Sequence, residues 1–275
     1  MTLLLQVSDP HFGTERPQVV DALVDFVHRQ TPGVMVLSGD ITQRALPEEF
    51  RAARTFVDRL GVPQVLAVPG NHDIPLYNLL QRVFRPYARH RQAFGDELEP
   101  SFESPDLLVI ALNTTRRYRH KHGEVSRAQV ERVSSRLRRA AATQLRVVVT
   151  HQPVAVTKAR DEVNLLRGHA DAVRRWVEAG VDLILGGHIH LPFLVPLHQR
   201  DPGLPRKAWA VQAGTAVSNR LRHGTGNSVN LIRVTHGPAG RPRAAVVERW
   251  DFSDDARGFH RVSSDELAFG DQASP

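Results

Sequence analysis

Residues 64–73 read QVLAVPGNHD, a short apolar run that ends in a cluster of polar side chains. The apolar run indicates a strand, and the glycine after it allows the backbone to turn. Ligands of α/β sheets bind beyond the carboxyl ends of the strands. Five such clusters follow apolar runs in this chain. Each alone could be a polar turn, but together they predict an α/β fold with one ligand site at the edge of the sheet where the strands end. The four other apolar runs end in DPH at 9–11, GD at 39–40, TH at 150–151 and GHIH at 187–190.

Helical patterns alternate with these runs, which is the signature of an α/β fold. Residues 17–30 and 47–60 each begin with proline and carry apolar residues on one face, and residues 169–179 also read as a helix. Ser126 and Gln129 predict a capping box for a helix that ends near residue 142. A further strand is expected at residues 107–112, and antiparallel strands are expected at residues 209–213, 229–234 and 244–250.

The chain is expected to form a single domain over residues 1–255, because no repeat or linker divides it. Residues 256–275 lack periodicity and are expected to be a loose C-terminal tail. Residues 74–104 interrupt the alternation directly after GNHD, and this segment is long, aromatic and basic. Such a segment predicts a lid or cap over the site, with a surface helical excursion as the equal alternative.

The composition is that of a globular protein, with 41% of the 275 residues hydrophobic and 24% charged. The chain has no cysteine, which excludes disulfides, thiolate nucleophiles and thiolate metal ligands. The first eight residues lack the basic start of a signal peptide, and no apolar stretch is long enough to span a bilayer. These features predict a cytoplasmic protein with no membrane partner.

The formal net charge of +7 has two interpretations. One is a basic surface for nucleic acid or membrane. The other is a general bias towards arginine, since only Lys121, Lys158 and Lys207 are lysines. The basic residues are dispersed, apart from residues 116–121 and 136–139. We favour the second interpretation, with some attraction of anionic substrates, and do not expect a nucleic-acid partner.

The spacing within the polar clusters suits a metal site. Asp9 and His11 are two residues apart, as are His188 and His190, so the members of each pair point the same way in extended backbone. Asn71 offers a neutral side-chain oxygen. Without cysteine, any metal must be held by nitrogen and oxygen atoms.

The series DxH, GD, GNHD, H and GHxH, in this order, resembles the calcineurin-like metallophosphoesterases over roughly residues 3–190. The resemblance implies a four-layer α/β/β/α sandwich and two divalent metal ions, with manganese, iron and zinc all compatible with the ligand types. It also implies that a hydroxide bridging the metals attacks a phosphate ester, with His72 beside the leaving group. One metal would be bound by Asp9, His11 and His190 and the other by Asn71, His151 and His188, with Asp40 bridging the two.

The second motif separates branches of this superfamily. Protein Ser/Thr phosphatases carry GDxxDRG there, with a second Asp that orients the catalytic histidine, and Gln43 takes the place of that Asp in this chain. Residues 39–41, 47–50 and 214–220 look more like the class III cyclic-nucleotide phosphodiesterases and glycerophosphodiesterases. This likeness implies a phosphodiesterase whose partner is a small anionic phosphoester, such as a cyclic nucleotide or a similar small diester.

Four alternatives remain beside the phosphodiesterase: a phosphomonoesterase, a pyrophosphate hydrolase acting on nucleotide-linked lipids, a DNA nuclease subunit and a non-catalytic scaffold. The intact ligand set argues against the scaffold, and the lack of long extra segments argues against the nuclease. A homodimer is left open. The candidate substrate-binding residues are Arg44, Tyr77 and Arg220, each of which could instead belong to a solvated surface.

Overall fold

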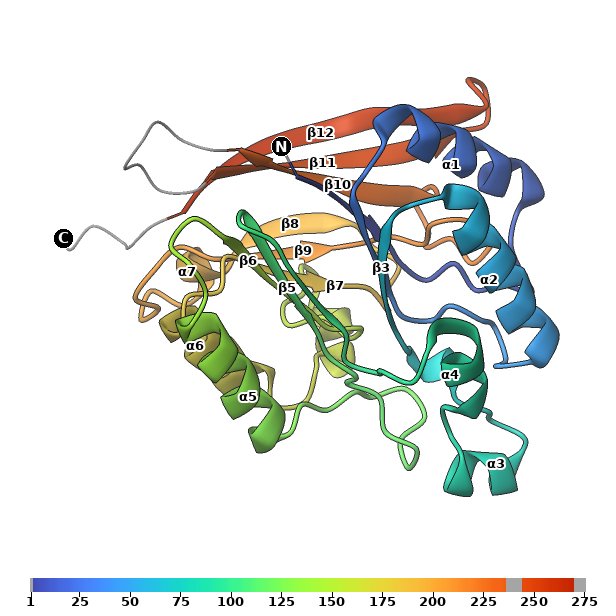
Figure 1. The fold of residues 1–275 in the computed structure, drawn as a ribbon, viewed down its shortest axis with the longest axis horizontal. Coiled ribbons are helices and arrows are strands. Elements are labelled where there is room, and N and C mark those ends of the chain that lie inside the picture. The colour runs from blue at the N-terminus through green and yellow to red at the C-terminus, as the bar shows by residue number, and fades with distance from the viewer. Residues whose placement is uncertain (1, 236–243, 270–275) are drawn as a thin grey trace.

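The computed structural model describes residues 2–235 and 244–269. Two six-stranded sheets face each other, and helices cover the outer side of each sheet (Figure 1). Three buried apolar clusters separate the layers, one between the first sheet and its helices, one between the two sheets, and one between the second sheet and its helices. The predicted four-layer α/β/β/α sandwich is confirmed.

The first sheet has the strand order β12-β11-β10-β1-β2-β3. β1, β2 and β3 are parallel, and β10, β11 and β12 extend the sheet beyond β1 by antiparallel pairing. The carboxyl ends of the three parallel strands therefore lie at one edge. The bounds are β1 Leu3–Val7, β2 Val34–Ser38, β3 Gln64–Val68, β10 Ser228–Thr235, β11 Ala244–Ser253 and β12 Gly258–Ala268.

The second sheet has the order β4-β5-β6-β7-β9-β8, with β5, β6, β7 and β9 parallel and β4 and β8 antiparallel at its edges. The expectation that residues 209–213 form a purely antiparallel strand is wrong, because β9 runs parallel to β7 and antiparallel only to β8. The bounds are β4 Ser101–Glu103, β5 Leu107–Ala111, β6 Leu145–Val149, β7 Leu183–Gly186, β8 Phe193–Pro196 and β9 Trp209–Gln212.

The helices begin and end where the sequence supplies the required residues. α1 and α2 both start at proline, and α2 ends at Gly61, which adopts the left-handed conformation. Ser126 accepts a hydrogen bond from the backbone N–H of Gln129, so the predicted capping box is confirmed. No helix in the described residues is long and apolar enough to cross a lipid bilayer. The bounds are α1 Pro17–Gln30, α2 Pro47–Leu60, α3 Leu79–Phe84, α4 Ala88–Phe94, α5 Arg127–Arg138, α6 His169–Glu178 and α7 Leu197–Arg200.

The prediction of a loose tail over residues 256–275 is wrong for Gly258–Ala268, which forms β12 and pairs with β11 along its length. β12 is an edge strand whose middle residues are mostly exposed, so it lacks the apolar alternation that identifies a half-buried strand. Backbone pairing holds it, together with Phe259 and Leu267, which are buried near its two ends. Residues 270–275 lie outside the described residues.

The segment 74–104 forms two short helices and the edge strand β4. α4 packs on α2, and the buried ring of His90 lies between Phe50 and Phe94. α3 has no buried residue and lies at the periphery, away from both sheets (Figure 1). The segment is therefore anchored through α4, and its role as a lid stays a prediction.

Candidate metal centre and substrate pocket

The ends of five parallel strands bring the predicted ligands together. β1 leads into Asp9 and His11, β2 into Asp40 and β3 into Asn71, while β6 leads into His151 and β7 into His188 and His190. The first three strands belong to one sheet and the other two to the second sheet. The side chains group into three sets that could each hold a metal ion: Asp9, His11 and His190; His11, Asp40 and His72; and Asp40, His151 and His188.

The backbone at these residues is held in an uncommon conformation. Asp9, His11, Asp40, His188 and His190 have φ angles of 49°, 45°, 47°, 72° and 53°, all in the left-handed region. This region is uncommon for residues other than glycine, and such strain persists only where the surrounding structure enforces it. The strand ends thus aim five ligand side chains at one point at a cost in local backbone energy.

Two glycines let the strand ends approach closely enough. A Cβ atom on Gly70 would lie 2.0 Å from the backbone nitrogen of Asp40, and one on Gly187 would lie 2.0 Å from Oγ of Ser8. Both distances are far below a van der Waals contact. The sequence indicated a turn at Gly70, and the structure adds that both glycines allow close packing behind the ligands.

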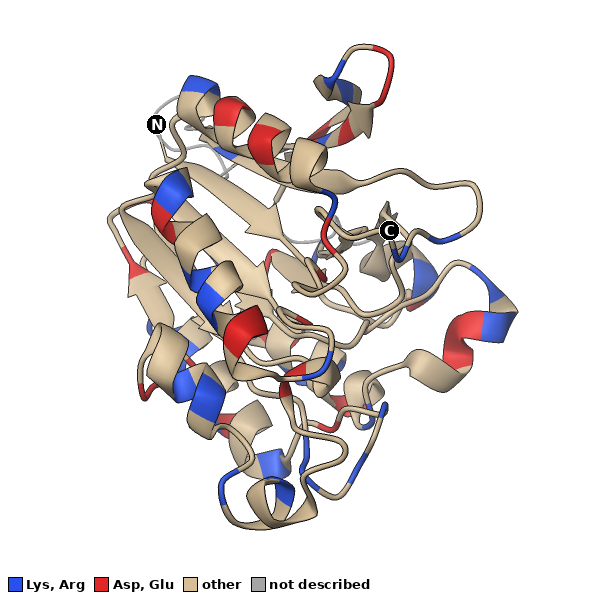
Figure 2. Cartoon of the chain, turned by 90° about the vertical axis from the view of Figure 1, so that its right-hand side faces the viewer, with Lys and Arg blue, Asp and Glu red and all other residues tan. Residues whose placement is uncertain are grey.

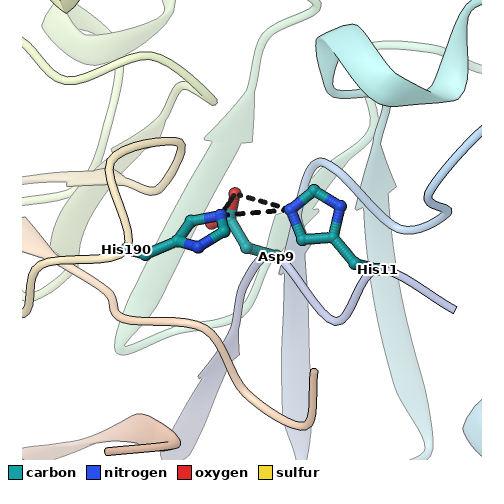
Figure 3. A group of neighbouring side chains, drawn as sticks. All are labelled: Asp9, His11 and His190. Atoms are coloured by element: carbon teal, nitrogen blue, oxygen red, sulfur yellow. Dashed lines mark hydrogen bonds and ion pairs between the residues drawn. The ribbon is translucent and has the colours of Figure 1, made fainter. Parts of the chain in front are cut away.

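The first ligand group is formed by Asp9, His11 and His190 (Figure 3). Nε2 of His190 lies 3.3 Å from Oδ1 of Asp9 and 3.1 Å from Nε2 of His11. Nδ1–H of His190 donates to the backbone carbonyl of Arg220 at 2.6 Å, so its Nε2 presents a lone pair to the group. Oγ of Ser8 donates to Oδ2 of Asp9 at 2.6 Å and fixes the carboxylate.

The second ligand group is formed around His151. Its Nε2 lies 3.2 Å from Oδ1 of Asp40 and 3.3 Å from Oδ1 of Asn71. Nδ1–H of His151 donates to the carbonyl of Ser38 at 2.9 Å, which leaves the Nε2 lone pair facing these oxygens. The ring of His188 stacks edge-on against His151 with centroids 5.2 Å apart.

Asp40 lies between the two groups. Its Oδ1 faces His151, and its Oδ2 lies 3.8 Å from Nε2 of His11 in the first group. One carboxylate thus turns one oxygen towards each group, which is the arrangement needed for a residue that bridges two metal ions. The backbone N–H of His72 donates to Oδ1 at 2.8 Å and helps to fix the orientation.

Electron-pair donors face one another in both groups, and this arrangement is stable only with positive charge between them. The pKa values reflect the same requirement. Burial alone would raise the pKa of Asp9, but His190 and His151 together lower it to about 2. Burial disfavours the charged form of His151, yet Asp40 and Asp9 raise its pKa to about 9. The buried Nδ1 atom of His188 has no hydrogen-bond partner among the described residues. These residues fit divalent metal ions bound through nitrogen and oxygen, and they do not distinguish manganese, iron and zinc.

His72 lies beside the ligand groups and is oriented by the backbone. Its Nδ1–H donates to the carbonyl of Gln43 at 2.8 Å, which directs Nε2 away from that contact. Nε2 lies 3.5 Å from Nη1 of Arg220, and the ring stacks edge-on against His11 at 4.9 Å. The residue that replaces the phosphatase Asp, Gln43, therefore still positions the histidine, through its main chain.

A cavity of about 480 Å³ opens over the ligand groups. Of the predicted substrate-binding residues, Arg220 lines the cavity, whereas Arg44 and Tyr77 do not. Arg44 is exposed, and the Tyr77 side chain is 83% exposed next to α3. The cavity is lined by Asp40, Asn71, His72, Lys121, Asn164, His188, Ile189, His190, Arg220, Leu221 and Arg222.

Arg222 also reaches the cavity, but its charge is compensated. It donates to both carboxylate oxygens of the buried Asp161, at 2.8 and 2.7 Å, and to the carbonyl of Ile189 at 3.0 Å. Arg222 therefore ties the GHIH turn to the segment around Asp161. Arg220 and Lys121 are the lining cations better placed to meet a substrate anion.

Asp73 is a supporting residue to which sequence reasoning gave no role, although it closes the GNHD motif. Its buried carboxylate accepts from the backbone N–H groups of Ile41, Thr42 and Gly70 and from the hydroxyl of Thr42. Burial and the neighbouring charge of Asp40 raise the pKa of Asp73 to about 6, against the effect of these hydrogen bonds. Asp73 thereby clamps the turn after β2 to the turn after β3.

Comparisons with known proteins agree with this geometry. A family model for calcineurin-like phosphoesterases matches residues 2–192. A glycerophosphodiester phosphodiesterase, GpdQ, from Enterobacter lignolyticus is 34% identical over 82 residues, covering 26% of this chain and 29% of that protein. A probable cyclic nucleotide phosphodiesterase from Synechococcus is 28% identical over 170 residues, covering 60% of this chain and 61% of that protein. The chain thus spans less than two thirds of either relative.

Solved structures share the fold at low sequence identity. A dimetal phosphatase from Danio rerio superposes with a TM-score of 0.66 at 14% identity, covering 98% of this chain and 99% of that one. The purple acid phosphatase PPD1 from yellow lupin gives a TM-score of 0.72 at 11% identity, covering 97% of this chain and 53% of that one. These two likenesses support the four-layer fold.

Proposed function

Because the chain belongs to the calcineurin-like phosphoesterase family, whose members hydrolyse phosphate esters at dinuclear metal centres, we propose that it is a phosphodiesterase acting on cyclic nucleotides or similar small diesters. The observation that carries the proposal is the pair of hydrogen bonds made by Gln43. Its carbonyl accepts from His72 and its side chain accepts from Arg220, so both residues are held side by side at the cavity. The second Asp of the protein Ser/Thr phosphatases is absent from this position. Two relatives bearing phosphodiesterase names support the same substrate class.

The ligand residues and His72 divide the work of hydrolysis. Two bound divalent ions would supply a nucleophile from water at neutral pH and polarise the phosphoryl oxygens. Asp9, His11 and His190 would hold one ion, and the group around His151 would hold the other, with Asp40 between them. In its protonated form, His72 would donate from Nε2 to the departing oxygen, because Nδ1 is already engaged with the Gln43 carbonyl.

The charge of the metal centre itself matches a singly charged substrate. Two divalent ions contribute four positive charges, and Asp9, Asp40 and a hydroxide would remove three of them. The metal centre itself would keep a residual charge of about +1, which matches a diester monoanion, and Arg220 and Lys121 add positive charge at the cavity. A doubly charged monoester would bind more tightly in the ground state, and tighter ground-state binding alone does not raise turnover.

Arg220 is proposed to bind a non-bridging phosphoryl oxygen, with Gln43 as its positioning residue. Nη1 of Arg220 donates to Oε1 of Gln43 at 2.7 Å, and the Arg220 carbonyl accepts from Nδ1–H of His190 at 2.6 Å. Gln43 in turn accepts from His72 through its own carbonyl. The four residues form a connected chain that links a metal ligand, an anion-binding group and the leaving-group histidine.

Removing the Arg220 charge or its support is expected to affect substrate binding more than turnover. Arg220→Ala should raise KM for a diester by roughly 10- to 100-fold, the size expected for losing a charged hydrogen bond. Gln43→Ala should raise KM less, with kcat nearly unchanged, because the carbonyl that holds His72 is retained. Steady-state kinetics on bis(4-nitrophenyl) phosphate measure both parameters.

The matched control is Arg44→Ala, which removes an exposed arginine that does not line the cavity. It should leave KM within about twofold of the wild type, since surface charges contribute little. An Arg44 variant as impaired as the Arg220 variant would contradict the assignment of Arg220.

The substrate class is tested by kcat/KM with four substrates and added manganese. Bis(4-nitrophenyl) phosphate should be hydrolysed faster than 4-nitrophenyl phosphate at neutral pH, and either 2′,3′- or 3′,5′-cyclic AMP should be a substrate. A clear preference for the monoester would favour the phosphomonoesterase alternative. Hydrolysis of the chromogenic diester without either cyclic nucleotide would keep the reaction and reject the cyclic-nucleotide substrate.

A further inference from the structure

Exposed apolar side chains concentrate at one place on the described surface. Eleven large hydrophobic side chains are exposed among the described residues, and six of them lie between Leu76 and Phe84. Leu80 and Phe84 are both 74% exposed. α3, which makes up most of this stretch, buries none of its residues. Exposed apolar side chains gathered in this way indicate an interaction site.

The loop that follows β5 lies against this stretch. Arg117 donates to the carbonyl of Val83 at 2.6 Å, and Arg82 donates to the carbonyl of Arg119 at 2.7 Å. The loop adds the ring of Tyr118, which is 68% exposed. We call the exposed residues of 76–85 and 117–121 the α3 surface. It reaches the mouth of the substrate cavity, because the last residue of this loop segment, Lys121, lines that cavity.

The α3 surface is basic as well as apolar. Its residues, 76–85 and 117–121, contain no aspartate or glutamate and five lysines and arginines, of which Arg119 pairs with Glu124 beside the surface at 2.8 Å. Arg85, Arg117 and Lys121 are exposed. α3, which lies at the lower end of the view in Figure 2, contains Arg82 and no acidic residue, and Arg85 follows it directly. A partner that binds this surface should therefore carry negative charge and also provide an apolar region.

We propose that the α3 surface docks on an anionic phospholipid surface. The exposed cations would meet the headgroup phosphates, and Leu80 and Phe84 would enter the acyl layer. The rings of Tyr77 and Tyr118 suit the boundary between headgroups and acyl chains. Docking of this kind needs no membrane-spanning helix, and it revises the sequence-based expectation of no membrane partner.

A second copy of the chain fits the α3 surface less well. In a twofold dimer the same patch faces itself, so the arginines of both copies would come together without any acidic residue from the patch to pair with them. An anionic lipid surface satisfies the apolar and the basic residues at once. The inference does not depend on the proposed function, because binding to vesicles is measured without a phosphoester substrate.

The test is co-sedimentation of the full chain with vesicles. The protein should bind vesicles that contain phosphatidylglycerol, bind phosphatidylcholine vesicles much less, and dissociate in high salt. The double variant Arg85→Glu with Arg117→Glu should weaken binding by roughly tenfold or more. Leu80→Asp and Phe84→Asp should weaken it similarly. The matched control is Val262→Asp on β12, which changes a 49% exposed apolar side chain outside the α3 surface and should bind like the wild type.

Melting temperatures of all variants show whether each one is folded. Failure of the wild type to bind either vesicle, or binding that Leu80→Asp leaves intact, would overturn the proposal. Sedimentation equilibrium tests the alternative that the α3 surface binds a second copy of the chain. A concentration-dependent dimer that Leu80→Asp dissociates, without vesicle binding, would assign the α3 surface to a second copy instead.

Discussion

Replacing Asp40 by alanine is expected to abolish turnover and to disrupt metal binding. Its Oδ1 lies 3.2 Å from Nε2 of His151, and its Oδ2 lies 3.8 Å from Nε2 of His11, so the change removes a carboxylate from both ligand groups at once. Metal ions contribute several kcal/mol to transition-state stabilisation, so the rate should fall by roughly 10³-fold or more. Metal analysis and diester hydrolysis measure the two effects.

The control for Asp40→Ala is Asp182→Asn. Asp182 is also fully buried, but it precedes β7 and therefore lies at the end of that strand opposite to His188. This variant loses stability through its contacts with Arg146 and Arg206, and its folded fraction should keep both metals. An Asp40→Ala protein with two bound metals and full activity would rule out the bridging role.

His72→Ala is expected to keep both metals and to lose rate by ~10²–10⁴-fold, the usual contribution of a general acid. Its imidazole is fixed through Nδ1 to the Gln43 carbonyl at 2.8 Å, and Nε2 is the atom that could give up a proton. The loss should shrink for nitrophenolate, which departs without protonation, and should be large for an alkoxide leaving group. Rates with a nitrophenyl diester and an alkyl diester measure this difference.

Metal analysis of His72→Ala distinguishes two roles. His72, His11 and Asp40 offer ligand atoms within 4.8 Å of one another, so the geometry itself would allow His72 to be a ligand. Loss of a metal ion in the variant would assign it that role. An equal loss of rate with good and poor leaving groups, with both metals retained, would show that His72 does not act as a general acid.

The positions of the ligand candidates could be predicted because they depend on local patterns. Each lies directly after an apolar run, and parallel strands bring such positions to one edge. Their backbone conformation could not be predicted in this way. Asp40 has a φ angle of 47° and His188 one of 72°. These angles depend on how the two sheets pack together, and the two sheets contain segments that are distant in the sequence.

Contacts between distant segments decide which substrate candidates reach the cavity. Gln43 and Arg220 are 177 positions apart, and only the fold brings the guanidinium to the Gln43 side chain. Arg44 and Tyr77 follow metal-binding motifs closely in sequence, yet neither lines the cavity. β12 was missed for the opposite reason, since backbone pairing with β11 holds a strand that has little apolar pattern.

Titration of metal-free protein with manganese tests the dinuclear centre most directly. Metal content and the rate of bis(4-nitrophenyl) phosphate hydrolysis are measured on the same samples. With Asp40 between two ligand groups, the rate is predicted to rise with added metal and to reach its maximum near two equivalents per chain. Full activity in metal-free protein with a chelator present, or saturation at a single tightly bound ion, would contradict a dinuclear phosphodiesterase.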